Sequence, residues 1–72
     1  MSPEKLTYMA NQIGKFFAHE GEEQAAHDIA DHLRRFWDPR MRKDILAHLS
    51  AGGAGLDPAV RRALEELKAG AS

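Results

Sequence analysis

Histidine and aspartate side chains are the groups in this sequence with the spacing best suited to metal binding. His27 precedes Asp31 by four residues, and Asp28 precedes His32 by four residues, so each pair would share one face of a helix. Only His48 is placed to add a ligand from the inner side of another expected helix. Zinc sites take three or four protein ligands, and no HExxH or comparable spacing is present. We therefore favour histidines that cap helices, hydrogen-bond to carboxylates or line an interface.

The sequence offers few residues for other kinds of catalysis. The 72 residues include no cysteine, which excludes disulfides, thiolate zinc sites and cysteine-ligated iron–sulfur clusters within the chain. The three serines lie at the two ends and in one expected loop, without the strand and turn of a nucleophile elbow. Residues 52–55, Gly-Gly-Ala-Gly, follow an expected helix and lack a following Gly-Lys-Ser/Thr, so they indicate a helix C-cap and not a phosphate loop. An independent catalyst is the least favoured hypothesis.

Residues 34–43, Arg-Arg-Phe-Trp-Asp-Pro-Arg-Met-Arg-Lys, form the most distinctive segment. Three interpretations are open. The segment could be a protein-binding surface, because Trp, Arg, Met and Phe are common at interface hot spots. It could be a nucleic-acid patch in which Trp37 stacks on a base. It could also be a helix corner whose Phe36 and Trp37 fill the core. The net charge of −1 argues against nucleic acid.

The elements that must position these residues are helical. We predict an all-α fold, a small bundle or orthogonal array of four short helices in one domain over residues 1–72. Each proline follows a side chain that can cap a helix, in Ser2-Pro3, Asp38-Pro39 and Asp57-Pro58. Apolar spacing of three and four predicts helices at about 3–19, 22–36, 39–49 and 58–68. A flexible connection is expected over residues 50–56.

The same spacing predicts the residues that each helix buries. They are Leu6, Met9, Ala10, Ile13, Phe16 and Phe17 in the first helix, Ala25, Ala26, Ile29, Ala30, Leu33 and Phe36 in the second, Met41, Ile45, Leu46 and Leu49 in the third, and Val60, Ala63, Leu64 and Leu67 in the fourth. The alanines of the second helix should let a neighbouring helix approach closely. No run of apolar residues reaches the 18 or so that a membrane span needs, and the N-terminus lacks a secretory pattern, so the expected compartment is the cytoplasm.

Several motifs together resemble one family. They are Met-Ala-Asn-Gln-Ile-Gly at 9–14 followed by Phe16-Phe17, Ile-Ala-Asp-His at 29–32, Phe-Trp-Asp-Pro-Arg-Met-Arg at 36–42, and a C-terminal pattern of Gly52-Gly53, Gly55-Leu56, Pro58, Val60 and Ala63. This combination resembles the delta subunits of the molybdenum-containing, NAD-dependent formate dehydrogenases. The resemblance covers about residues 6–67, and the heptad at 36–42 is its specific element.

The resemblance implies a place in a cytoplasmic complex that oxidises formate to carbon dioxide and reduces NAD. In that family the alpha subunit holds the molybdenum–pterin cofactor and iron–sulfur clusters. The beta and gamma subunits carry flavin, NAD binding and further clusters. The delta subunit has no cofactor of its own and helps to assemble or stabilise the complex.

We therefore expect a non-catalytic accessory subunit that binds the alpha subunit, and through it the beta and gamma subunits. The expected interface is Phe36, Trp37, Asp38, Pro39, Arg40, Met41 and Arg42. No catalytic, cofactor-binding or metal-binding residue, nucleic-acid partner or membrane partner is expected, and the isolated chain could self-associate. Two alternatives stay open: a small nucleic-acid-binding module that uses the basic residues 34–43, and a transient chaperone that inserts the molybdenum cofactor.

Overall fold

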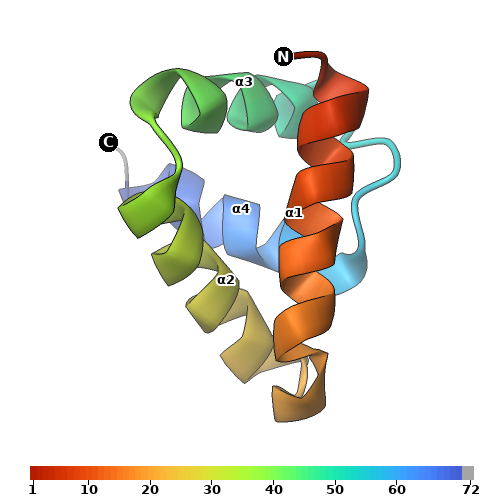
Figure 1. The fold of residues 1–72 in the computed structure, drawn as a ribbon, viewed down its shortest axis with the longest axis vertical. Coiled ribbons are helices and arrows are strands. Elements are labelled where there is room, and N and C mark those ends of the chain that lie inside the picture. Colours follow the sequence, from red (N-terminus) through yellow and green to blue (C-terminus); the bar gives the residue numbers. More distant parts are fainter. Residues whose placement is uncertain (71–72) are drawn as a thin grey trace.

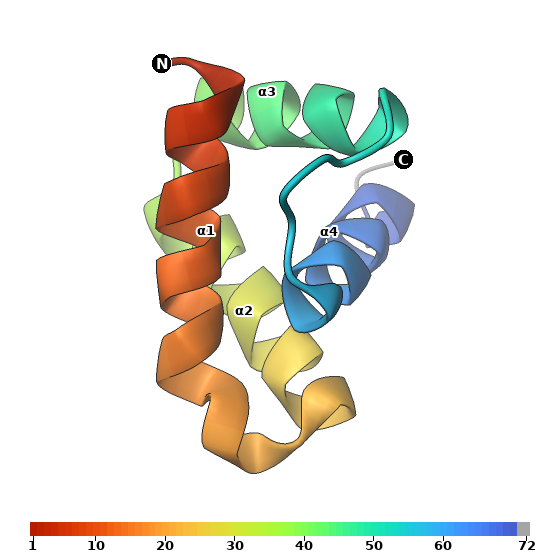
Figure 2. The same cartoon turned by 90° about the vertical axis from the view of Figure 1, so that its right-hand side faces the viewer.

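The computed structural model of the chain describes residues 1–70, which form four α-helices and one short 3₁₀ turn and contain no strand. The helices are α1 (Pro3–Phe17), α2 (Glu22–Phe36), α3 (Pro39–Ser50) and α4 (Pro58–Gly70), and the 3₁₀ turn η1 (Ala18–Glu20) follows α1. The predicted all-α class is confirmed. Helices α1, α2 and α3 form the sides of a triangle, and α4 crosses behind it (Figure 1). The loop from α3 to α4 descends between α1 and α4 (Figure 2).

Two of the three predicted N-caps are made by side chains. Ser2 Oγ accepts the backbone N–H of Lys5 at 3.2 Å, and Asp38 Oδ1 accepts the backbone N–H of Met41 at 2.9 Å. These bonds satisfy donors that the first turn of a helix otherwise leaves free. Pro58 begins α4 as predicted. The chain therefore enters each helix where the sequence indicates.

The predicted end of the first helix needs a small correction. The α-helical pattern stops at Phe17, and residues 18–20 tighten into the 3₁₀ turn. Gly21 then takes a φ of 86°, a left-handed value that glycine adopts without the cost of a Cβ. Because Gly21 reverses the chain here, α2 begins at the next residue.

The core lies between the inner faces of all four helices. Helix α4 packs more extensively against α2 than any other two helices pack, and the predicted alanine face of α2 is buried there. The buried apolar side chains are Leu6, Ala10, Ala25, Ala26, Ile29, Ala30, Leu33, Trp37, Ile45, Leu56, Val60, Ala63, Leu64 and Leu67. Met9, Ile13, Phe17, Met41, Leu46 and Leu49 pack against them and are partly buried.

Two phenylalanines that we predicted in the core are on the surface. Phe16 is 75% exposed and Phe36 is 72% exposed. Phe16 comes two residues after the buried Gly14, which places it more than half a turn around a helix of 3.6 residues per turn. Phe36 is the last residue of α2, and the side chain that follows it, Trp37, enters the core instead.

The connection between α3 and α4 is fastened to its neighbours, so the prediction of a flexible segment over 50–56 is wrong. Asn11 Nδ2 donates to the carbonyl of Gly55 at 2.8 Å, and Asn11 Oδ1 accepts the N–H of Asp57 at 3.0 Å. Arg61 Nη2 donates to the carbonyl of Gly53 at 3.0 Å. Leu56 is buried. Side chains from α1 and α4 thus hold this loop in one conformation.

Gly14 allows α1 and α4 to approach closely. A Cβ added at Gly14 would lie 2.7 Å from Cγ2 of Val60 and 3.6 Å from Cδ1 of Ile29. The first distance is shorter than a carbon–carbon contact allows, and the branched side chain of Val60 has few rotamers with which to move away.

We expect Gly14→Ala to destabilise the fold by about 1–3 kcal/mol, because overpacking outweighs the gain of about 0.5–1 kcal/mol that alanine gives in a helix. In a Val60→Ala background the clash is gone, so the same substitution should become stabilising. Urea denaturation of the four proteins of this cycle measures both effects. If Gly14→Ala changes the free energy of unfolding in the same direction in both backgrounds, the close contact with Val60 does not determine its effect.

Candidate protein-binding surface

The heptad at 36–42 forms the corner between α2 and α3. Trp37 is only 6% exposed, and its side chain belongs to the hydrophobic core. Its backbone N–H donates to the carbonyl of Leu33 at 3.0 Å, which ends α2. Whether Trp37 lies in the core or at an interface was open from sequence, and the structure places it in the core.

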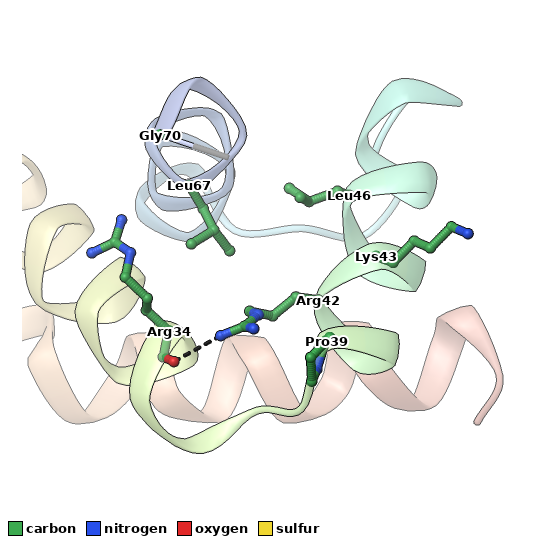
Figure 3. A pocket seen from close by; sticks show the side chains of 7 residues that line it. All are labelled: Arg34, Pro39, Arg42, Lys43, Leu46, Leu67 and Gly70. Atoms are coloured by element: carbon green, nitrogen blue, oxygen red, sulfur yellow. Dashed lines mark hydrogen bonds between the residues drawn. The ribbon is translucent and has the colours of Figure 1, made fainter. Parts of the chain in front are cut away.

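Other members of the heptad hold the corner together. Asp38 caps α3, and Pro39 is the first residue of α3. Arg42 Nη1 donates to the backbone carbonyl of Arg34 at 2.7 Å, which joins α3 to the last turn of α2 (Figure 3). The side chain of Met41 packs partly buried against the core. Each of these residues has a structural role.

Phe36, Asp38, Pro39 and Arg40 are the exposed members of the heptad. Asp38 and Pro39 form the start of α3, which leaves Phe36 and Arg40 without such a role. The side chain of Arg40 has no hydrogen bond or ion pair within residues 1–70. The interface role of the heptad stays a prediction, and Phe36 and Arg40 are its exposed side chains that do not cap or begin a helix. The other residues of the heptad fix the positions of Phe36 and Arg40.

Phe36 stands at one end of a row of rings that the sequence analysis did not find. We call Phe16, Phe17, His32 and Phe36 the aromatic face. The ring centroids are 4.7 Å apart for His32 and Phe36, 6.5 Å for Phe17 and His32, and 5.2 Å for Phe16 and Phe17. A shallow hollow of about 340 Å³ lies beside them. The sequence held one signal for this face. Residues 6–17 contain more large apolar side chains than one stripe of a helix can bury, so some of them must be exposed.

The histidines do not form the metal-binding pairs considered above. Within residues 1–70, no group of three or more His, Asp or Glu side chains is arranged to hold a metal ion. His48 Nε2 lies 2.8 Å from the carbonyl of Ala54 and can donate to it. His27 lies 3.2 Å from a carboxylate oxygen of Glu66 on α4, and His32 stacks in the aromatic face.

Two acids meet where η1 packs against α2. The pKa of Glu20 is raised, first by a hydrogen bond with the carboxyl of Asp28, then by burial and by the charge of Asp28, while His19 opposes the shift. Glu20 Oε1 is buried without a hydrogen-bond donor. We expect one proton to be shared between the two carboxyls, because it would supply that donor and remove their repulsion.

Comparison with known proteins identifies the family. A family model described as NADH-dependant formate dehydrogenase delta subunit FdsD matches residues 5–64. The chain belongs to this delta-subunit family. Searches of curated proteins and of solved structures gave no significant match. Within residues 1–70, no helix combines the length and apolar character needed to cross a membrane.

The motifs by which the delta-subunit family was recognised in the sequence are mostly structural. In the first motif, Asn11 fastens the α3–α4 loop and Gly14 lets α4 approach. In the heptad, Trp37 fills the core and Arg42 closes the corner. A motif can therefore identify the family and still contribute only some of its residues to a binding surface.

Replacing adjacent aromatic residues should separate folding from binding. Trp37→Ala should cost about 3–5 kcal/mol, as for other buried aromatic residues. Cores of this size supply about 3–5 kcal/mol in total, so this variant should lose most of its helical circular dichroism at 25 °C. Phe36→Ala should cost less than about 1 kcal/mol, because the ring is exposed. Equal losses of stability in the two variants would contradict the placement of Trp37 in the core and Phe36 on the surface.

The Glu20–Asp28 pair should make stability depend on pH. Because the folded state binds this proton more tightly than the unfolded chain, the contribution of Glu20 is complete below its ordinary pKa and is lost as pH rises through the raised pKa. Glu20→Gln keeps a neutral donor at every pH. The Tm of the variant minus the Tm of the natural chain should therefore increase from pH 4 to pH 7. Glu65→Gln, at an exposed position on α4, is the control. A Tm difference that does not change with pH would rule out the shared proton.

Proposed function

We propose that this chain is a non-catalytic accessory subunit of a cytoplasmic, NAD-dependent formate dehydrogenase. It binds the molybdenum-containing alpha subunit and, through it, stabilises the complex with the beta and gamma subunits. The observation that carries the proposal is the match to the delta-subunit family over residues 5–64. A chain that binds only the folded form of its partner stabilises that form by mass action.

The aromatic face supports a role in binding. Phe16 and Phe36 leave most of their ring surface in water, although a chain this short has few large side chains to spare for its core. Each ring is held against a neighbouring ring, so little side-chain freedom is left to lose on docking. Arg40 adds an unpaired charge at the α2–α3 corner. Aromatic and arginine side chains of this kind are typical of interface hot spots.

The side chains of this chain also support a structural role over a catalytic one. The sequence contains no cysteine that could ligate an iron–sulfur cluster. His48 and His27 face groups of the chain itself, and His32 lies between the rings of Phe17 and Phe36.

A transient chaperone for the molybdenum cofactor is the alternative closest to this proposal. The two differ in stoichiometry. A permanent subunit stays in the purified, active enzyme at a fixed ratio to the alpha subunit, whereas a chaperone leaves after the cofactor has been inserted. Quantitative mass spectrometry of the purified enzyme distinguishes them.

We expect Phe36→Ala and Arg40→Ala to weaken binding to the alpha subunit. A hot-spot truncation costs about 2 kcal/mol or more, which corresponds to about thirtyfold in Kd. Expression of each variant in cells that lack the natural chain, followed by affinity capture, measures the recovered alpha subunit and the formate-dependent reduction of NAD. Both should fall.

Arg62→Ala is the matched control for Arg40→Ala. Arg62 is also exposed, lies on α4 and pairs only with Glu22 at 3.1 Å, so its loss should leave recovery unchanged. If the natural chain fails to capture the alpha subunit, the proposed function is wrong. If capture succeeds and neither Phe36→Ala nor Arg40→Ala reduces it, the assignment of these residues to the interface is wrong.

A further inference from the structure

A groove separate from the aromatic face lies at the α2–α3 corner. It has a volume of about 460 Å³ and shares no lining residue with the aromatic face. Helices α2, α3 and α4 enclose it, as Figure 3 shows. The lining residues are Arg34, Pro39, Arg42, Lys43, Leu46, Leu67 and Gly70.

The groove concentrates positive charge in a chain whose net charge is −1. Within the described residues 1–70, its lining contains three basic side chains and no acidic side chain. Arg42 donates to a backbone carbonyl, which is neutral and leaves the charge of the guanidinium uncompensated. Among residues 1–70, the side chains of Arg34 and Lys43 have neither a hydrogen bond nor an ion pair.

Helix stability accounts for only part of this charge. Arg34 lies in the last turn of α2, where a cation complements the helix dipole. Arg42 and Lys43 lie in the first half of α3, and the first turn of α3 has no acidic residue. A cation near the N-terminal end of a helix opposes the dipole. The basic residues of α3 therefore do not serve the stability of their own helix.

The interior of the groove is apolar. Leu46 of α3 and Leu67 of α4 point toward one another across it, and Pro39 lies at the start of α3 (Figure 3). Arg34 stands at the α2–α4 side of the groove, and Lys43 lies at the opposite side with its side chain directed away from the leucines (Figure 3). A ligand that fits this arrangement has an apolar side chain for the interior and negative charges for the two sides.

We propose that this groove binds an acidic segment of the alpha subunit that carries at least one large apolar side chain. The apolar side chain lies between Leu46 and Leu67, and carboxylates of the segment pair with Arg34 and Lys43. The volume is within the range of small binding pockets and holds one or two large side chains. This inference rests on the proposed function, because it specifies the chemistry of the partner's surface.

The groove favours a protein segment over nucleic acid. Sites for single-stranded nucleic acid combine basic residues with aromatic rings on which bases stack. Among the residues that the structure describes, the lining of this groove includes no aromatic residue, and its leucines would stay uncovered under a phosphate backbone.

The first test measures binding to purified formate dehydrogenase from cells that lack the chain. The double variant Arg34→Gln/Lys43→Gln should bind about tenfold more weakly than the natural chain and with a shallower dependence on salt. The control Lys5→Gln/Arg62→Gln removes the same two charges outside the groove and should bind like the natural chain. Tm values of all variants establish that they are folded.

The second test identifies the occupant. Because the chain has no cysteine, Lys43→Cys introduces a single thiol to which a photo-crosslinker can be attached at the side of the groove. After assembly with the purified enzyme, mass spectrometry should find it joined to an acidic stretch of the alpha subunit. The same label at Lys5→Cys should not reach that stretch.

Four results would overturn the inference. If the natural chain binds the enzyme but the groove variant binds equally tightly, the groove is not used, while the proposed function stands. If position 43 crosslinks to a segment without acidic residues, or if the natural chain binds an oligonucleotide that competes with the enzyme for the groove, the proposed occupant is wrong. If the natural chain does not bind the enzyme at all, the proposed function and this inference fail together.

Discussion

The junction between α2 and α3 is the constraint on which the rest of the structure depends. Trp37 and Asp38 are both extended, so one helix stops and the next starts with no intervening loop. The indole of Trp37 fills the core, the carboxylate of Asp38 caps α3, and Arg42 reaches back to the carbonyl of Arg34. In a chain without disulfides, these contacts fix the angle between the two helices, and that angle leaves the space that α4 occupies behind them (Figure 1).

The same junction decides what the chain presents to a partner. Where α2 ends, the core admits Trp37, so its neighbour Phe36 is turned to the surface and stacks on His32. Arg40 is turned outward in the first turn of α3. A heptad that is characteristic of the delta-subunit family thus combines a structural frame with a small number of exposed side chains. If this surface binds a partner as proposed, its geometry is fixed before binding, which lowers the entropy lost on association.

Charge is distributed unevenly along the molecule, and two different physical effects account for it. Acids at the start of α2 and bases at its end complement the dipole of that helix, and Glu22 also pairs with Arg62 on α4. The basic residues in the first half of α3 have no such explanation. Arg42 donates to the last turn of α2, and within residues 1–70 Lys43 has no ion-pair partner. Both line an apolar groove, which is the arrangement expected where a partner supplies both the carboxylates and the apolar side chain.

The sequence by itself determined the four helices, because proline, capping side chains and apolar spacing act locally along the chain. It also excluded cysteine chemistry and pointed to the family through the heptad at 36–42, and the family match bears that out. Tertiary structure alone decided that Trp37 and not Phe36 enters the core, that Asn11 fastens a loop more than 40 residues away, and that three helices enclose a basic groove. Periodicity shows which side of a helix is apolar, but burial and pocket formation depend on which other elements cover that side, and those contacts join residues far apart in the sequence.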